Sequence, residues 1–490
     1  MANGQGLVSQ LSKLIATFLQ HVKEARRTVA ELRAGVHGDS ASRAHSFLAI
    51  FEHVQDAYER ALRAERAIDF QDMIGRAADL VEAGRFKSPY RYIIVDEFQD
   101  MSRGRARLLR SLLGQVTDRR LTCVGDDWQA IYRFAGSDLS QMTLFARNYG
   151  YTASVSLDTS FRFGHRLQQA SERFVQKNPA QLRKTLRALS DEGRAAVVIV
   201  PASKAPAGGE GGAAEATRSD IEGILTLIAA EAPSGATVYL LGRYNFSTSG
   251  ANIEDIGRRT PQLKVEFRTV HRSKGLQADY VVLLDVKSGR FGFPSEIVDD
   301  PLLSLVLSEP DGLEHAEERR LFYVALTRAK RRVYVLARET ERSTFVEELL
   351  GAEYAGLVEA IGSWTDAIQC PDCGGTLVRR LNGKTGAPFW GCVDYPYCSG
   401  SAQVCAVCQL GAIVQDGATL RCNQKGCTGR QDLCPECASG ALVIRTNRQT
   451  AQQFWACTGW RADKSGCNYT TNVRPGNAPS TPKRPRPRAS

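Results

Sequence analysis

Apolar and polar positions in the first 83 residues of the chain alternate with the period of an α-helix. The apolar positions of the first segment recur at spacings of three and four: Leu7, Leu11, Leu14, Ile15, Phe18, Leu19 and Val22. This pattern predicts an amphipathic helix over 7–34, a break within 35–40, and further helix over 42–83. We therefore expect residues 1–89 to form a helical region.

Short apolar runs rich in β-branched residues follow this region and predict strands. Helical patterns separate most of the runs, including one at 101–113, and the runs lie at 92–95, 121–124, 196–200, 237–241, 280–285 and 332–336. Strands that alternate with helices are typical of an α/β domain with a parallel sheet. The segment 201–217 is rich in Pro, Gly and Ala, which predicts a mobile surface loop.

The composition indicates a globular, basic protein. Of the 490 residues, 63 are Lys or Arg and 53 are Asp or Glu, so the formal charge is +10. A basic chain favours a polyanionic partner, usually nucleic acid. No apolar run reaches the ~18 residues of a membrane span, and polar residues interrupt the first apolar segment, unlike a signal peptide. We therefore expect a cytoplasmic protein with no membrane partner.

Twelve of the 13 cysteines fall between Cys370 and Cys467. The remaining one, Cys123, lies in an apolar strand and is expected to be a buried core thiol. CxxC pairs in a chain without a signal peptide are typical of zinc sites rather than disulfides. The pairs form three blocks, Cx2C-x18-Cx5C, Cx2C-x13-Cx4C and Cx2C-x19-Cx9C: Cys370, Cys373, Cys392 and Cys398; Cys405, Cys408, Cys422 and Cys427; Cys434, Cys437, Cys457 and Cys467.

Four thiolates can close a tetrahedral Zn²⁺ site and fold a segment too small for a core of its own. We predict zinc ribbons at 370–404, 405–430 and 431–472 and about three Zn²⁺ per chain. The nine residues between Cys457 and Cys467 are an unusual spacing for such a site. A linker is expected at 346–369. Residues 473–490 hold five Pro, five Lys or Arg and no acid, which predicts a disordered basic tail.

Two acids, Asp96 and Glu97, directly follow the apolar run at 92–95. In nucleotide-hydrolysing α/β folds, the carboxyl end of such a strand lies beside the phosphates. There, Asp96 can hold Mg²⁺ through its water shell, and Glu97 can orient and deprotonate the attacking water. The alternative is that the two acids only cap a strand before the next helix.

The segment 125–136 follows the next strand and combines Gln129 with three aromatic residues, Trp128, Tyr132 and Phe134, and with Arg133. Aromatic rings beside an arginine on a loop suit stacking on unpaired bases. The alternative is that the rings fill the core, as Phe134 could, although three rings interleaved with Asp, Gln and Arg make an awkward core sequence. Two more arginines, Arg162 and Arg328, lie in basic surroundings and suit the charge of a transferring phosphoryl group.

In this order, the segments DEFQD, GDDWQAIYRF, SFRF, TVHRSKGLQ and AEERRLFYVALTRAK resemble the motifs of UvrD/Rep-type superfamily 1 helicases, and specifically their helicase IV group. The resemblance covers about 45–345. It implies a RecA-like P-loop helicase core with a partial first domain at 90–155, a complete second domain at 156–345, and residues 1–89 as an accessory helical part of the first domain.

The resemblance also implies an ATP-dependent helicase that moves 3′ to 5′ on single-stranded or partly duplex DNA and acts in DNA repair. It implies that Asp96 binds Mg²⁺ and that Glu97 is the catalytic base. Other roles follow position by position: Gln129, Arg162 and Arg328 contact the γ-phosphate; Gln277, where the family usually has Glu, contacts the ribose; Tyr132 and Phe134 stack on bases; Thr269 and His271 lie along the DNA strand.

The first cysteine block resembles the zinc ribbons of type IA topoisomerases, which are implicated in single-stranded DNA binding. The resemblance implies that Arg379, Arg380 and Trp390 contact DNA. The alternative is that zinc serves only as a structural staple.

One family motif is absent, because no GxxxxGKS/T occurs in the 490 residues. The Gly-Lys-Thr at 383–385 lies inside the first cysteine block. Three interpretations follow: an N-terminally shortened helicase, which the intact other motifs favour, a second chain that supplies the phosphate loop, or an inactive ATPase. The rival functions are a non-catalytic single-stranded DNA-binding module and one half of a split two-chain ATPase. Only 26 residues separate Gly242 from Thr269, so we expect no large accessory domain there.

Overall fold

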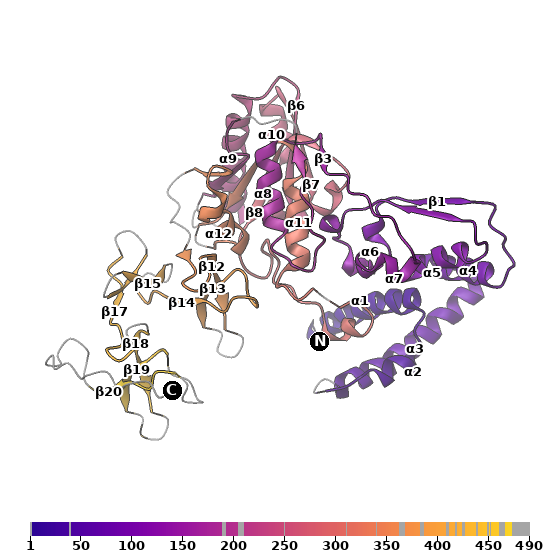
Figure 1. Ribbon diagram of the computed structural model, residues 1–490, viewed down its shortest axis with the longest axis horizontal. Helices are drawn as coiled ribbons and strands as arrows, with labels where there is room; N and C mark the ends of the chain where they lie inside the picture. Colours follow the sequence, from indigo (N-terminus) through magenta and orange to yellow (C-terminus); the bar gives the residue numbers. More distant parts are fainter. Residues whose placement is uncertain are drawn as a thin grey trace. The chain divides into compact units, whose positions relative to one another are not determined.

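The computed structural model describes two compact units, residues 1–349 with 353–362 and residues 350–352 with 363–490. The described residues are 2–38, 41–188, 193–203, 210–248, 250–309, 311–339, 341–361, 368–382, 387–407, 411–416, 419–423, 427–437, 440–447, 450, 452–459 and 466–472. Figure 1 shows both units and labels many of their helices and strands. Among these residues, no helix has the length and apolar content needed to cross a bilayer. The predicted tail at 473–490 lies outside them.

The first unit begins with four helices, α1 (Ala2–Ala25), α2 (Val29–Ala34), α3 (Ala41–Glu65) and α4 (Phe70–Glu82). The single helix expected over 7–34 is wrong, because the chain turns at Arg26 with φ of 51° and Thr28 caps a new helix. Thr28 and Glu31 form a reciprocal capping box, a signal that the apolar periodicity conceals. Asp69 likewise caps α4 by accepting from the backbone N–H of Asp72 at 2.8 Å.

A two-stranded parallel sheet follows, made of β1 (Tyr92–Val95) and β2 (Arg120–Cys123), with α5 (Arg103–Leu113) between them. The strand runs at 92–95 and 121–124 and the helix at 101–113 are thereby confirmed. Cys123 is half-buried rather than buried, and burial raises the pKa of its thiol to about 12. The chain then continues through α6 (Ser140–Thr143), α7 (Phe145–Tyr149), β3 (Thr159–Ser160), α8 (His165–Val175) and β4 (Arg187–Ala188).

A six-stranded, all-parallel sheet forms the centre of the first unit, which confirms the α/β fold class. Its strand order is β10 (Val358–Ala360), β5 (Val197–Pro201), β9 (Ala329–Ala337), β8 (Ala278–Val286), β6 (Ala236–Gly242) and β7 (Leu263–Thr269). The four apolar runs predicted here are confirmed as β5, β6, β8 and β9. The sequence did not predict β7, because this edge strand carries exposed charges at Lys264 and Glu266.

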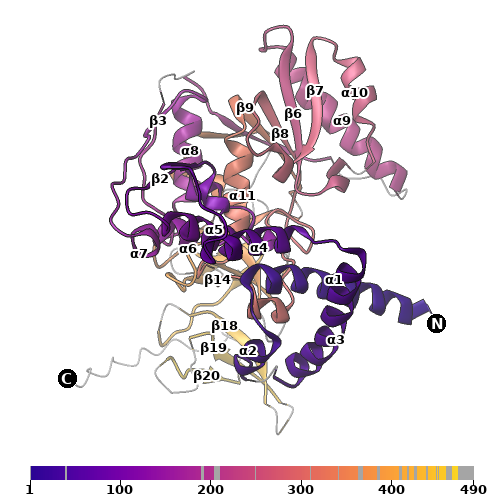
Figure 2. The same cartoon turned by 90° about the vertical axis from the view of Figure 1, so that its right-hand side faces the viewer.

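Helices cover both faces of this sheet (Figure 2). On one face, α9 (Glu210–Ala229) and α10 (Ile253–Arg259) pack on buried residues of the strands. On the other face lie α8, α11 (Ala316–Leu326) and α12 (Thr344–Leu349), joined by ring contacts among Phe174, Phe322 and Phe345. The loop expected over 201–217 is wrong for 210–217, because α9 begins at Glu210; residues 204–209 lie outside the described chain.

The second unit contains two antiparallel sheets. The larger one has seven strands in chain order: β11 (Ile368–Gln369), β12 (Thr376–Leu381), β13 (Pro388–Cys392), β14 (Ser401–Val404), β15 (Ala412–Asp416), β16 (Thr419–Cys422) and β17 (Arg430–Gln431). The smaller one has three: β18 (Leu442–Thr446), β19 (Gln453–Cys457) and β20 (Thr470–Thr471). Cysteines belong to each of the small cores of these sheets, which is the arrangement expected of metal-stapled ribbons.

Candidate nucleotide and DNA site

The two acids after β1 stand at the exposed carboxyl end of the strand. Glu97 has a left-handed backbone conformation, with φ of 49° and ψ of 44°, which turns the chain sharply out of the strand. Asp96 stabilises this turn by accepting a hydrogen bond of 2.8 Å from the backbone N–H of Glu97. Both carboxylates are exposed and therefore accessible to a ligand.

Gln99, which the sequence analysis did not single out, holds these acids against the loop that follows β2. Its side-chain amide donates to Glu97, and its Oε1 accepts from the backbone N–H of Asp126 at 2.9 Å. Gly125 makes this approach possible, since a Cβ at that position would lie 2.8 Å from Oε1 of Gln99. The only sequence signal for Gln99 is its place directly after the acids in DEFQD.

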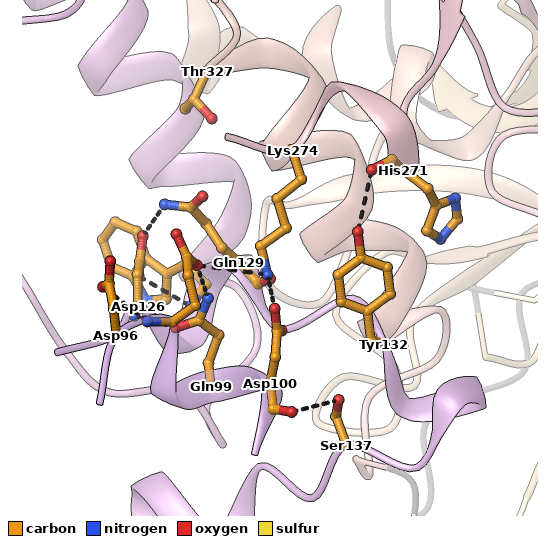
Figure 3. A network of polar contacts seen from close by, with 12 residues as sticks. Asp96, Gln99, Asp100, Asp126, Gln129, Tyr132, Ser137, His271, Lys274 and Thr327 are labelled. Atoms are coloured by element: carbon orange, nitrogen blue, oxygen red, sulfur yellow. Dashed lines mark hydrogen bonds and ion pairs between the residues drawn. The ribbon is translucent and has the colours of Figure 1, made fainter. Parts of the chain in front are cut away.

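At Gln129, loops from the two-stranded β1-β2 sheet and from the six-stranded sheet meet (Figure 3). Its Nε2 donates to Asp126 at 2.7 Å, and its Oε1 accepts from Nη2 of Arg328 at 3.4 Å. Its backbone carbonyl accepts from Nζ of Lys274 at 3.0 Å. Arg328 and Lys274 belong to the six-stranded part of the unit, so Gln129 is contacted from both sides.

Arg328 is fully buried and bonded mainly to backbone oxygens. Its Nε donates to the carbonyl of Val324 at 2.9 Å and its Nη1 to that of Leu276 at 3.2 Å. Burial, together with the nearby positive charge of Arg162, lowers the pKa of Arg328 to about 10. An anion beside these two guanidinium groups would favour the charged form of Arg328, which burial and Arg162 disfavour.

Lys274 is the second residue that the sequence analysis missed. Its Nζ lies 2.6 Å from Oδ2 of Asp100 and 3.8 Å from Oε2 of Glu97, and it stands over the ring of Tyr132 at 4.9 Å. Burial raises the pKa of Asp100, and the hydrogen bond from Lys274 opposes that rise. Lys274 thus connects the acids of one loop to the aromatic residues of another.

The aromatic residues of the segment 125–136 differ in burial, and this difference corrects the expectation from the sequence. Trp128, and not Phe134, fills the core: its ring is fully buried against Tyr323, and its Nε1 donates to Leu182 at 3.1 Å. Phe134 is 53% exposed. The hydroxyl of Tyr132 donates to the backbone carbonyl of His271 at 3.2 Å.

The loop after β7 brings His271 beside these rings. The imidazole lies 5.5 Å from the ring of Phe134, and burial together with Arg243 lowers its pKa to about 4, so it is neutral at pH 7. Thr269 accepts from the backbone N–H of Arg272, and Gln277 is exposed in the same loop. Tyr132, Phe134, Thr269 and His271 therefore belong to loops that meet, whereas Gln277 contributes no hydrogen bond to this network.

In the second unit, the sulfur atoms of the first and third cysteine blocks gather into two groups of four within 4.8 Å. The second block contributes Cys405, Cys422 and Cys427, and Cys408 lies outside the described residues. Thiolate sulfurs at tetrahedral spacing are the donor set that Zn²⁺ prefers, so the clusters fit this ion.

The expectation that Trp390 stacks on DNA is wrong for this structure, because its ring is buried in the core of the large sheet. Arg380 donates to the carbonyl of Cys392 at 3.0 Å and stands over the ring of Tyr395. Arg379 pairs with Trp390 through the backbone, and its side chain lies outside the described residues. The exposed rings of this ribbon are Tyr395 and Tyr397.

Comparison with known protein families finds matches in both units of the chain. Residues 5–150 match the UvrD/REP helicase N-terminal domain, and residues 251–340 match the UvrD-like helicase C-terminal domain. The chain is therefore similar to UvrD/REP-type helicases over both of these segments. Residues 367–404 and 431–461 match the topoisomerase DNA-binding C4 zinc finger. These matches include the whole first cysteine block and three cysteines of the third, Cys434, Cys437 and Cys457.

The curated relatives are helicases that are longer than this chain. DNA helicase IV of Escherichia coli strain K12 is 40% identical over 297 residues, which is 60% of this chain and 40% of that protein. The ATP-dependent DNA helicase UvrD1 of Mycobacterium tuberculosis strain H37Rv is 27% identical over 184 residues, or 36% of this chain and 23% of that protein. The ATP-dependent DNA helicase Rep of Escherichia coli strain K12 is 27% identical over 181 residues, or 36% and 25%.

Proposed function

We propose that this chain is part of an ATP-driven motor of the helicase IV type, which moves 3′ to 5′ along single-stranded DNA. The observation that carries the proposal is the set of hydrogen bonds made by Gln129. There, Arg328 from one sheet and the acid-bearing loops of the other sheet come together around one polar side chain. A group that bridges two sheets can sense a nucleotide and transmit its hydrolysis to their relative motion.

The residues around Gln129 fit a magnesium nucleotide in charge and donor type. The exposed carboxylate of Asp96 would hold Mg²⁺, which, when bound, neutralises phosphate charge. Glu97 would take the proton of the attacking water. Gln129, Arg162 and Arg328 would contact the γ-phosphate, and Arg328 keeps its charge at pH 7 because its lowered pKa of about 10 still exceeds that pH. Gln277 would contact the ribose.

DNA would lie along the loops that carry Tyr132, Phe134, Thr269 and His271. Phe134 offers an exposed ring for stacking, and Tyr132 is fixed by its bond to His271. Because Lys274 contacts both Glu97 and the ring of Tyr132, a shift of the rings on DNA would alter the surroundings of the catalytic base. Through this contact, DNA binding would be coupled to hydrolysis.

The phosphate loop itself would come from outside these 490 residues, which contain no GxxxxGKS/T. The small sheet supports this: Tyr92 and Ile94 of β1 point the same way and are 72% and 74% exposed. Parallel sheets are normally covered on both faces, so these residues call for a further α/β segment that packs on β1 and β2. We propose that this segment carries the loop that cradles the β- and γ-phosphates.

The cysteine clusters would each hold one Zn²⁺ and present the ribbons to single-stranded DNA. The two ribbon matches to a DNA-binding zinc finger and the exposed rings of Tyr395 and Tyr397 support this role.

ATP hydrolysis tests the motor proposal. The 490-residue chain, with single-stranded DNA and Mg²⁺, should hydrolyse ATP negligibly. Addition of the phosphate-loop segment of Escherichia coli DNA helicase IV, as a fusion or a second polypeptide, should produce DNA-stimulated hydrolysis. Glu97→Gln should then lower that rate by about 10²–10⁴-fold without weakening DNA binding.

Two outcomes would contradict the proposal in different ways. Glu97-dependent hydrolysis by the 490 residues alone would mean that other residues of this chain hold the phosphates. DNA binding without hydrolysis in every combination would favour the non-catalytic DNA-binding function.

A further inference from the structure

A group of aromatic residues lies on the six-stranded sheet beyond the loops already described. Strands β7, β6 and β8 are neighbours and run parallel, so their carboxyl ends meet at one edge, where α/β sheets bind ligands. The loop after β7 carries His271. The loops after β6 and β8 carry Tyr244, Phe246 and Phe291.

These three rings form an ordered corner. Tyr244 and Phe246 are stacked, with centroids 4.9 Å apart and planes 5° from parallel. Phe291 stands edge-on to both, at 5.9 and 5.7 Å. Phe246 is 56% exposed and Phe291 48% exposed, so the outer ring of the stack and its perpendicular neighbour face solvent.

Polar contacts beneath the rings hold them in place. The hydroxyl of Tyr244 donates to Oγ of Ser295 at 2.8 Å, and the N–H of Ser295 donates to Glu318 at 3.0 Å. Glu318 also pairs bidentately with Arg243, whose guanidinium lies 4.8 Å from the ring of Tyr244. At Gly242, a Cβ would lie 2.6 Å from Ser247, so the sharp turn after β6 requires glycine. The rings are thus preorganised rather than loosely exposed.

The surroundings indicate which ligand the corner suits. Burial of an exposed Phe side chain against a flat apolar group is favourable, because it removes apolar surface from water. Arg290 is exposed and lies 5.6 Å from the ring of Phe291, and Arg272 is exposed on the neighbouring loop. Apolar faces with a rim of arginines match the flat bases and anionic backbone of single-stranded nucleic acid.

We propose that Phe246 and Phe291 form a stacking site for the unpaired bases of single-stranded DNA. The site would extend the DNA path from Tyr132 and Phe134 past His271 along the edge of the six-stranded sheet. His271 connects the two parts of this path, because its ring lies 5.5 Å from that of Phe134 and its loop follows β7, the strand that pairs with β6. This inference rests on the proposed DNA binding of the first unit.

Photocrosslinking of the full chain to a single-stranded oligonucleotide of thymidine and 5-iododeoxyuridine identifies the residues that contact the bases. We expect crosslinked peptides that contain Phe246 or Phe291, in addition to peptides that contain Tyr132 or Phe134. The double variant Phe246→Leu/Phe291→Leu should lose the crosslinks at positions 246 and 291. Its affinity for single-stranded DNA should fall about 5- to 150-fold per lost stack. Phe246→Trp should keep both the crosslinks and the affinity, because it retains an aromatic face.

Phe86 provides the matched control, since it is an exposed phenylalanine outside these loops. Phe86→Leu should change neither the crosslinked peptides nor the affinity for single-stranded DNA. Equal thermal melting of the variants would exclude misfolding. Crosslinks at Tyr132 or Phe134 but none at 243–248 or 287–296, with unchanged affinity in the leucine variants, would overturn the inference and point to a protein partner for the corner. No crosslink anywhere within 1–362 would instead overturn the proposed DNA path of the first unit.

Discussion

Lys274 shows how one side chain links separate parts of the first unit. Its ammonium is bonded to the carboxylate of Asp100 and the carbonyl of Gln129, and lies near Glu97. Neither residue type nor spacing distinguishes this lysine from others in the sequence. Lys274 makes these contacts because its loop follows β7, and the end of β7 lies opposite the loop after β1.

Replacement of Lys274 by Met should destabilise the first unit by about 1–3 kcal/mol at pH 7, because it leaves the partly buried Asp100 carboxylate without its charged partner. Burial already raises the pKa of Asp100, and loss of Lys274 removes the effect that opposes this rise. The folded variant then binds a proton more readily than the unfolded chain, so its deficit should shrink as the pH falls.

Urea unfolding of the variant and the parent chain at pH 7 and pH 5 measures this difference. Lys264→Met, on the exposed face of β7, is the matched control and should have little effect at either pH. A deficit that stays constant or grows towards pH 5 would show that Asp100 is not the group left unpaired.

At the scale of elements, the ribbons depend on their cysteines more than on apolar cores. Each small core includes cysteine side chains, and the sulfurs of two blocks form complete groups of four. Segments of this size rarely fold without a metal or a disulfide. Metal binding and ribbon folding should therefore be one equilibrium.

Protein purified without chelator should contain about three Zn²⁺ per chain, and EDTA should unfold the strands of the second unit. Cys373→Ser should lower the zinc content by one ion, whereas Cys123→Ser, in the first unit, should leave it unchanged. Atomic emission analysis gives the count. Two zinc ions in the parent chain would remove one block from the proposal, and disulfides in place of metal would refute it.

At the scale of the whole molecule, charge should govern DNA affinity. Residues 473–490 carry five Lys or Arg and no acid. If these neutralise five phosphates, they contribute a slope of about −3 to −4 to log K against log salt on single strands. A chain that ends at 472 should therefore bind with a shallower slope, whereas Glu97→Gln should keep the slope of the parent.

Fluorescence anisotropy with labelled oligothymidine over a range of salt concentrations yields both slopes. An identical slope with and without 473–490 would show that the basic segment does not contact the phosphates.

The sequence by itself determined the features that depend on near neighbours along the chain. The apolar runs at 92–95 and 280–285 predicted strands that the structure contains. The order of the motifs identified the acids after β1 and Arg328, and the spacing of the cysteines predicted the ribbons. Local patterns carry this information because strand and helix periods and metal-ligand spacings are set over a few residues.

Only the tertiary structure decided which side chains are buried and which meet. It put Trp128 in the core and left Phe134 exposed, buried Trp390 among the strands of its ribbon, and joined Lys274 to Asp100 across 174 positions of the sequence. It also brought Phe246 and Phe291 together from two loops. Burial and contact depend on residues far away along the chain, and the all-parallel order of β7, β6 and β8 places their loops at one edge.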